Sequence, residues 1–160
     1  MKIFKHPIFF GGFKHFKTAF FLSLMNMPMP GTLRWVFAKR AGVQFIVPKG
    51  EKPWFFIGKN VTFDTVHPEN IIVHNGTHIT ADCTLLTHRL DTKNPDLSDI
   101  YWLPNKIVLE ERAFIGTKTV ICSDVTVGKG SIVGASSVVT KDIPPYQIWG
   151  GNPATFIKNR

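Results

Sequence analysis

An apolar residue returns at every sixth position through the second half of the chain. The unbroken series is Leu109, Ile115, Ile121, Val127, Val133 and Val139. Smaller residues keep the same spacing four positions later, at Ala113, Thr119, Val125, Ser131 and Ser137. Earlier in the chain the spacing holds for Val73, Ile79 and Leu85 and for Ile57 and Phe63, with a slip in register that indicates a short insertion at 67–69.

A period of six fits neither the 3.6-residue repeat of a helix nor the two-residue alternation of an ordinary hairpin. It predicts a triangular coil in which three short strands make one turn, large residues point inward and small residues fill the corners. Equivalent side chains then stack 18 positions apart. We therefore expect Leu109 to lie under Val127, Ile115 under Val133 and Ile121 under Val139, in an all-β domain of parallel strands.

The first fifty residues do not repeat and have a different composition. They contain eight Lys and Arg and no Asp or Glu, whereas the remainder of the chain carries equal numbers of each sign. We expect two short helices, at 13–24 and 33–41, which cap a coil that begins near residue 51. Because phenylalanines lie among these cations, contact with a membrane surface is an alternative role. No apolar run is long enough to span a bilayer, and we expect a cytoplasmic protein.

The repeat and the residues near its end carry a family resemblance. The run VGKGSIVGASSVVTKDIPP from Val127 to Pro145 and the later GNPATFIK at 151–158 resemble the bacterial hexapeptide-repeat acyltransferases, especially the maltose, galactoside and exopolysaccharide O-acetyltransferases. The resemblance covers about 58–160. It implies a left-handed parallel β-helix, a homotrimer, and transfer of an acetyl group from acetyl-CoA to a sugar hydroxyl, in the assembly of cell-surface polysaccharide or lipopolysaccharide.

Transfer to a hydroxyl needs a general base, and histidine is suited to that task at neutral pH. His88 follows the coil that contains Leu85 and precedes an irregular stretch at 89–105, which is a candidate loop for acceptor recognition. The resemblance implies that His88 is the base. Asp64 and Asp91 are the two candidates for an orienting carboxylate, and each has the alternative of an ordinary loop residue.

The resemblance also implies a groove for coenzyme A between neighbouring subunits. Its pantetheine arm would contact the backbone at Gly116, Thr117, Gly134 and Ala135. Thr140 and Lys141 match positions near the adenine and phosphates, and Lys158 matches a contact to the 3′-phosphate. Solvated surface charge is the alternative for both lysines.

Two functions other than acyl transfer remain open. The histidines His74 and His78 allow comparison with the zinc-dependent γ-type carbonic anhydrases, although their spacing is one residue short of that family's usual pattern. The other alternative is a β-helix without catalysis that serves as an assembly module. Cys83 and Cys122 form neither a metal-binding pair nor a disulfide framework by spacing, and we expect no metal.

Overall fold

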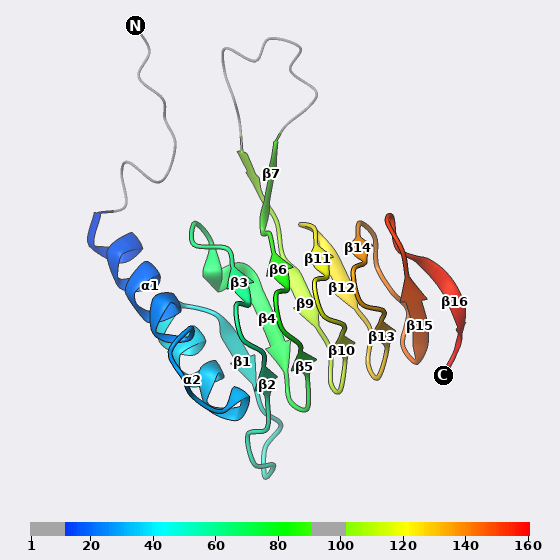
Figure 1. Cartoon of the computed structure of the whole chain (residues 1–160), viewed down its shortest axis with the longest axis horizontal. Helices are drawn as coiled ribbons and strands as arrows, with labels where there is room; N and C mark the ends of the chain where they lie inside the picture. Colours follow the sequence, from blue (N-terminus) through cyan, green and yellow to red (C-terminus); the bar gives the residue numbers. More distant parts are fainter. Residues whose placement is uncertain (1–11, 91–101) are drawn as a thin grey trace, which may run out of the picture.

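The chain winds into a coil whose turns each add one short strand to three sheets (Figure 1). The computed structural model describes residues 12–90 and 102–160. The first sheet contains β1 (Gln44–Ile46), β4 (Ile71–His74), β9 (Ile107–Leu109) and β12 (Val125–Val127). The second contains β2 (Phe56–Ile57), β5 (His78–Ile79), β10 (Phe114–Ile115), β13 (Ile132–Val133), β15 (Gln147–Gly150) and β16 (Thr155–Asn159). The third contains β3 (Thr62–Phe63), β6 (Thr84–Leu85), β11 (Val120–Ile121) and β14 (Val138–Val139).

The predicted stacking of the large apolar residues is confirmed in all three sheets. Leu109 pairs with Val127, Ile115 with Val133 and Ile121 with Val139, each between parallel strands. All six side chains are fully buried, so they form one continuous aliphatic column. Because each coil hydrogen-bonds to the next through its backbone, the peptide groups are satisfied along the stack.

Small residues occupy the corners because the chain bends sharply there against the neighbouring coil. Ala113, Thr119, Ser131 and Ser137 are all fully buried. Polar members of this set bond to the backbone: the Ser137 hydroxyl donates to the Gly134 carbonyl at 2.6 Å, and Thr119 donates to the same carbonyl at 3.2 Å. Each corner is therefore closed by a side chain small enough to fit and able to hydrogen-bond.

Two helices cover the end of the coil at which the chain starts (Figure 1). They are α1 (Gly12–Leu24) and α2 (Gly31–Ala41), close to the predicted bounds. The buried Arg34 of α2 holds this layer in place: Nε donates to the Met25 carbonyl at 2.8 Å and Nη1 to the Ile57 carbonyl at 3.2 Å. β1 pairs with β4, so the parallel stack starts before the predicted boundary at residue 50.

Two irregular segments depart from the coil near its middle. The 3₁₀ helix η2 (Pro68–Asn70) lies where the register of the repeat indicated an insertion. β7 (His88–Leu90) and β8 (Trp102–Pro104) pair in antiparallel fashion and project from the coil as the two arms of the predicted insertion at 89–105 (Figure 1). Asp64, which precedes the first segment, contacts the predicted base His88, and the second segment begins at His88.

At the opposite end the chain turns back on itself. β15 runs parallel to β13, and β16 then pairs with β15 in the antiparallel sense. All five residues of β16 are exposed, including Lys158. The coil thus ends on a strand that presents side chains to solvent on both faces.

Candidate active site

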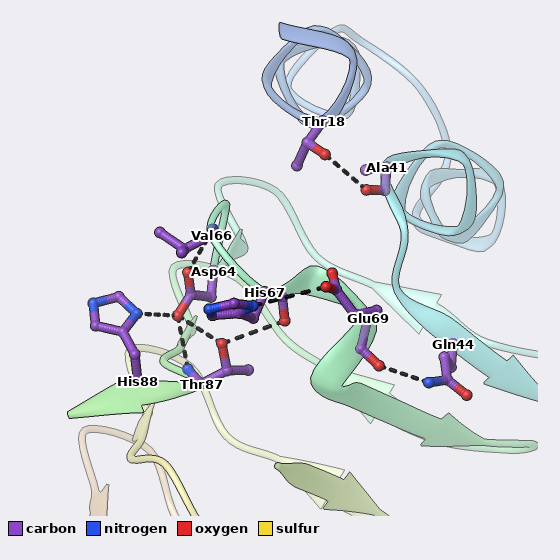
Figure 2. A network of polar contacts seen from close by, with 9 residues as sticks. All are labelled: Thr18, Ala41, Gln44, Asp64, Val66, His67, Glu69, Thr87 and His88. Atoms are coloured by element: carbon purple, nitrogen blue, oxygen red, sulfur yellow. Dashed lines mark hydrogen bonds and ion pairs between the residues drawn. The ribbon is translucent and has the colours of Figure 1, made fainter. Parts of the chain in front are cut away.

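Asp64 lies directly after β3, buried beneath the turn that leads to η2 (Figure 2). Its two carboxylate oxygens receive four hydrogen-bond contacts. Oδ1 accepts from the Val66 backbone N–H at 2.8 Å. Oδ2 accepts from the backbone N–H and the hydroxyl of Thr87, both at 2.8 Å, and lies 2.5 Å from His88 Nδ1. The carboxylate is therefore fixed from several directions.

His88 stands where the coil gives way to the projecting hairpin. The preceding Thr87 is fully buried, whereas the His88 side chain retains 23% of its exposure. Figure 2 shows the imidazole on one side of the Asp64 carboxylate and Thr87 on another. The arrangement anchors one edge of the ring in the protein and leaves the ring partly accessible to solvent.

The protonation state of Asp64 determines which nitrogen of His88 can act as a base. Burial by itself would raise the pKa of this carboxyl, but hydrogen bonds from Val66 and Thr87 and the charge of a protonated His88 outweigh it, and the pKa lies below its ordinary value of 3.8. At neutral pH the carboxylate is ionised and can only accept hydrogen bonds. Nδ1 of a neutral imidazole must then carry the hydrogen that points at Asp64. The lone pair is left on Nε2, as a general base requires.

The structure thus brings together two of the three predicted catalytic residues. Asp64 was one of the two candidates for an orienting carboxylate, and it contacts His88. Asp91 lies outside the described residues. Thr87 was not singled out, although it makes two of the contacts to Asp64. The sequence signal for it was its place directly before His88 and two residues after Leu85, which is fully buried.

The two glycines predicted to contact coenzyme A differ in their surroundings. A Cβ atom at Gly116 would lie 2.5 Å from the backbone nitrogen of Ala135, so packing between coils by itself requires glycine there. At Gly134 the nearest atom, the Trp149 carbonyl oxygen, would be 3.5 Å away, which leaves room for a side chain. Packing therefore does not require glycine at position 134, and a ligand could approach the backbone there because no side chain covers it.

The other predicted coenzyme A residues lie on the outside of the coil. Ala135 and Thr140 are exposed, and the Thr117 hydroxyl bonds to the Thr80 hydroxyl of the preceding coil at 3.2 Å. Lys141 extends over the Trp149 ring, with Nζ 5.3 Å from its centroid. Lys158 is exposed on β16. These cations are accessible, as contact with phosphate groups would require.

The histidines considered for zinc have other neighbours. His74 Nδ1 lies 3.5 Å from Glu111 Oε1. The His78 ring packs edge-on against Trp54, with centroids 4.4 Å apart, and burial lowers its pKa. Within residues 12–90 and 102–160, no group of three or more His, Cys, Asp or Glu side chains is arranged to hold a metal ion. The described residues give no support to the zinc alternative.

Both cysteines are free, and burial raises the pKa of each thiol. Cys83 is fully buried at a corner, where its sulfur contacts the Gly116 carbonyl oxygen at 3.2 Å. A thiol with a raised pKa is a poor nucleophile at neutral pH because little thiolate is present. Both residues therefore fit a packing role.

Comparison with known proteins identifies the type of repeat and the fold. The family model of the bacterial transferase hexapeptide (six repeats) matches residues 106–141. A Schizosaccharomyces pombe protein named as an acetyltransferase is 36% identical over 116 residues, which are 71% of this chain and 53% of that protein. The chain thus spans about half the length of this relative.

Solved structures share the architecture over most of the chain. A hexapeptide-repeat acetyltransferase from Vibrio cholerae has a TM-score of 0.68 at 22% identity, covering 91% of this chain and 90% of its own. The maltose O-acetyltransferase from Clostridium difficile has a TM-score of 0.66 at 19% identity, covering 91% and 86%. By its repeats and its coil, the chain is a member of the hexapeptide-repeat proteins, with the fold of these acetyltransferases.

Proposed function

We propose that the protein is an acetyl-CoA-dependent O-acetyltransferase in which His88 is the general base. The observation that carries this proposal is the buried, ionised Asp64 at His88 Nδ1, which leaves the lone pair of the imidazole on Nε2. A purely structural histidine does not need a carboxylate held by three further hydrogen bonds. Such a carboxylate fixes both the tautomer and the orientation of the ring, which is what a base in acyl transfer needs.

The reaction follows from this geometry as a direct transfer. His88 Nε2 takes the proton of the acceptor hydroxyl as the oxygen attacks the carbonyl carbon of the acetyl thioester. The imidazolium that forms is stabilised by the adjacent Asp64 carboxylate. When the C–S bond breaks, Nε2 returns the proton to the departing thiolate, so the products are the acetyl ester and free coenzyme A. Asp64 and Thr87 act as positioning residues, since they act through His88.

Several features support acetyl-CoA as the donor. The Vibrio cholerae relative has been solved in complex with acetyl-CoA. In this chain, Gly134 is a glycine that packing does not require, it lies beside the exposed Ala135, and Lys141 and Lys158 provide accessible cations for phosphate groups. Lysine acts there as a point charge on a flexible stem.

The acceptor that we propose is a sugar hydroxyl, within the synthesis of cell-surface polysaccharide or lipopolysaccharide. The likeness to a maltose O-acetyltransferase supports a sugar, and the hairpin that starts at His88 is suitably placed to select it. Our proposal includes left-handed winding of the coil, assembly as a homotrimer with donor sites between subunits, and a cytoplasmic location.

Two measurements on matched variants test the proposal. Calorimetric titration with acetyl-CoA should show about one site per subunit, weakened by Lys158→Glu. Release of free coenzyme A should then be followed with a panel of sugars. His88→Gln should bind acetyl-CoA like the wild type and lose transfer by about 10²–10⁴-fold. His74→Gln, which changes a second histidine beside a carboxylate, is the control and should transfer normally.

Each contrary outcome points to a different alternative. Equal transfer by wild type and His88→Gln would remove the base assignment. Absence of acetyl-CoA binding by the folded protein would reject the transferase and favour a non-catalytic assembly module, whereas stoichiometric zinc in the purified protein would favour the carbonic anhydrase alternative.

A further inference from the structure

Helix α1 has two apolar faces, and within residues 12–90 and 102–160 only one of them packs against the rest of the protein. The inner face is anchored by Thr18, whose hydroxyl donates to the Ala41 carbonyl of α2 at 3.0 Å, and by Met25 just beyond the helix, which is 2% exposed (Figure 2). Leu22 packs against the core between them. This face attaches α1 to the rest of the protein.

The opposite face of α1 presents two phenylalanines to solvent. Phe16 is 70% exposed and Phe20 49% exposed, and they lie one helical turn apart with ring centroids separated by 6.5 Å. At 100° per residue, their direction lies roughly opposite to that of Thr18 and Leu22. An i,i+4 pair of rings stabilises a helix by only about 0.2–0.5 kcal/mol, and these two leave much of their apolar area in water, so the pattern indicates a surface for a partner.

One exposed cation lies within this pair in sequence, and no acidic residue occurs in the same part of the chain. Lys17 lies between them in sequence and is exposed, as are Lys39 and Arg40 at the end of α2. Residues 1–50 contain eight Lys and Arg and no Asp or Glu. The two helices thus present exposed aromatic rings together with positive charge and carry no acidic residue, and the complement of such a surface is an apolar layer covered by negative charge.

We propose that the outer face of α1, defined by Phe16, Lys17 and Phe20, docks on the surface of an anionic lipid bilayer. A short helix lies on a membrane when its aromatic rings enter the interface and its lysines contact the anionic lipid headgroups. α1 has 13 residues, and no helix in the described part of the chain is long and apolar enough to cross a bilayer. The two helices occupy one end of the coil, so α1 can meet a flat surface while the sheets project away from it (Figure 1).

This proposal does not depend on the acyltransferase activity, and its test needs no substrate. The full chain is incubated with vesicles of phosphatidylcholine alone or with about a third of phosphatidylglycerol, and the bound fraction is measured by flotation. We expect binding to the anionic vesicles only, and its loss as salt shortens the screening length from about 10 Å at 0.1 M to about 3 Å at 1 M. Phe16→Ser/Phe20→Ser should weaken binding by at least about tenfold, and Lys17→Glu should weaken it as well.

The matched control is Phe156→Ser, which removes an equally exposed phenylalanine at the far end of the coil and should leave binding unchanged. Thermal melting establishes that each variant is folded. Absence of binding by the wild type, equal binding to neutral vesicles, or full binding by the double variant would each overturn the proposal. A change in molecular mass of the double variant by light scattering would assign the face to a second copy of the chain and would also overturn it.

Discussion

Asp64→Asn tests the role of the buried carboxylate because it changes charge and donor pattern while nearly preserving shape. The carboxylate receives contacts from Val66, Thr87 and His88, all of which donate to it. An amide offers one oxygen and one NH₂ group. If the oxygen occupies the Oδ2 position, the NH₂ group faces the Val66 N–H, and one buried donor is left without an acceptor. If the amide is turned the other way, the NH₂ group faces Thr87 and His88.

Both orientations have predictable costs. An unsatisfied buried donor costs about 1–3 kcal/mol, so the free energy of unfolding should fall by that amount. In the second orientation His88 must accept a hydrogen bond at Nδ1, which moves its own hydrogen to Nε2 and abolishes the base. In either orientation the imidazolium formed in the reaction loses the negative charge beside it, so we expect the transfer rate constant to fall, by about 10²–10⁴-fold where the base is abolished. The affinity for acetyl-CoA should change little, because Asp64 contacts none of the predicted donor-binding residues.

The assay combines release of coenzyme A, calorimetric binding of acetyl-CoA, and thermal melting on the same preparation. Glu111→Gln is the control, since it makes the same chemical change in the carboxylate that lies 3.5 Å from His74. It should leave transfer unchanged. A folded Asp64→Asn protein that transfers at the wild-type rate would refute the reasoning that Asp64 sets the tautomer of His88.

Three further predictions concern stability and binding. Gly116→Ala places a Cβ atom 2.5 Å from backbone and should destabilise the coil by about 1–3 kcal/mol, whereas Gly134→Ala should melt like the wild type but bind acetyl-CoA more weakly in calorimetry. Arg34→Met leaves two carbonyl groups without their donor, so the free energy of unfolding should fall by about 1–3 kcal/mol and Tm by about 2–4 °C for each kcal/mol. An unchanged Tm would refute the anchoring role of Arg34. The pKa of Asp64 is lower in the folded than in the unfolded state, so its ionised form contributes stability above the unfolded pKa, and that contribution is lost as pH falls through the folded pKa. Below about pH 4, Tm should therefore fall more steeply with pH in the wild type than in Asp64→Asn. Parallel curves of Tm against pH for the two proteins would contradict this.

The coil could be predicted from the sequence because every turn repeats the same local rule. A large residue at every sixth position forces the same face inward, and hydrogen bonding between equivalent strands then places Ile115 on Val133. The two helices were also predictable, because their apolar segments lie on either side of the run at 26–31, whose Pro and Gly residues interrupt a helix. The comparisons agree with this result: the family model covers the same repeat, at 106–141.

The contact between Asp64 and His88 depended on the tertiary structure. Phe63 pairs with Leu85, 22 positions on, because η2 and its flanks add residues to that turn of the coil. Only this lengthened turn places Asp64 next to Thr87 and His88, and the length of an irregular insertion does not reveal its path. For the same reason, the exposure of Phe16 and Phe20 could not be read from their apolar character.

The sequence by itself therefore determined the repeat and the stacking order of the core, because these follow from spacing and residue type, and the family resemblance supplied His88 as the candidate base. Tertiary structure decided that Asp64 meets His88, which glycine is required by packing, and which face of α1 stays exposed among the described residues. Those properties depend on distances between segments far apart in the chain, and such distances are set only when the coil, the insertion and the helices pack together.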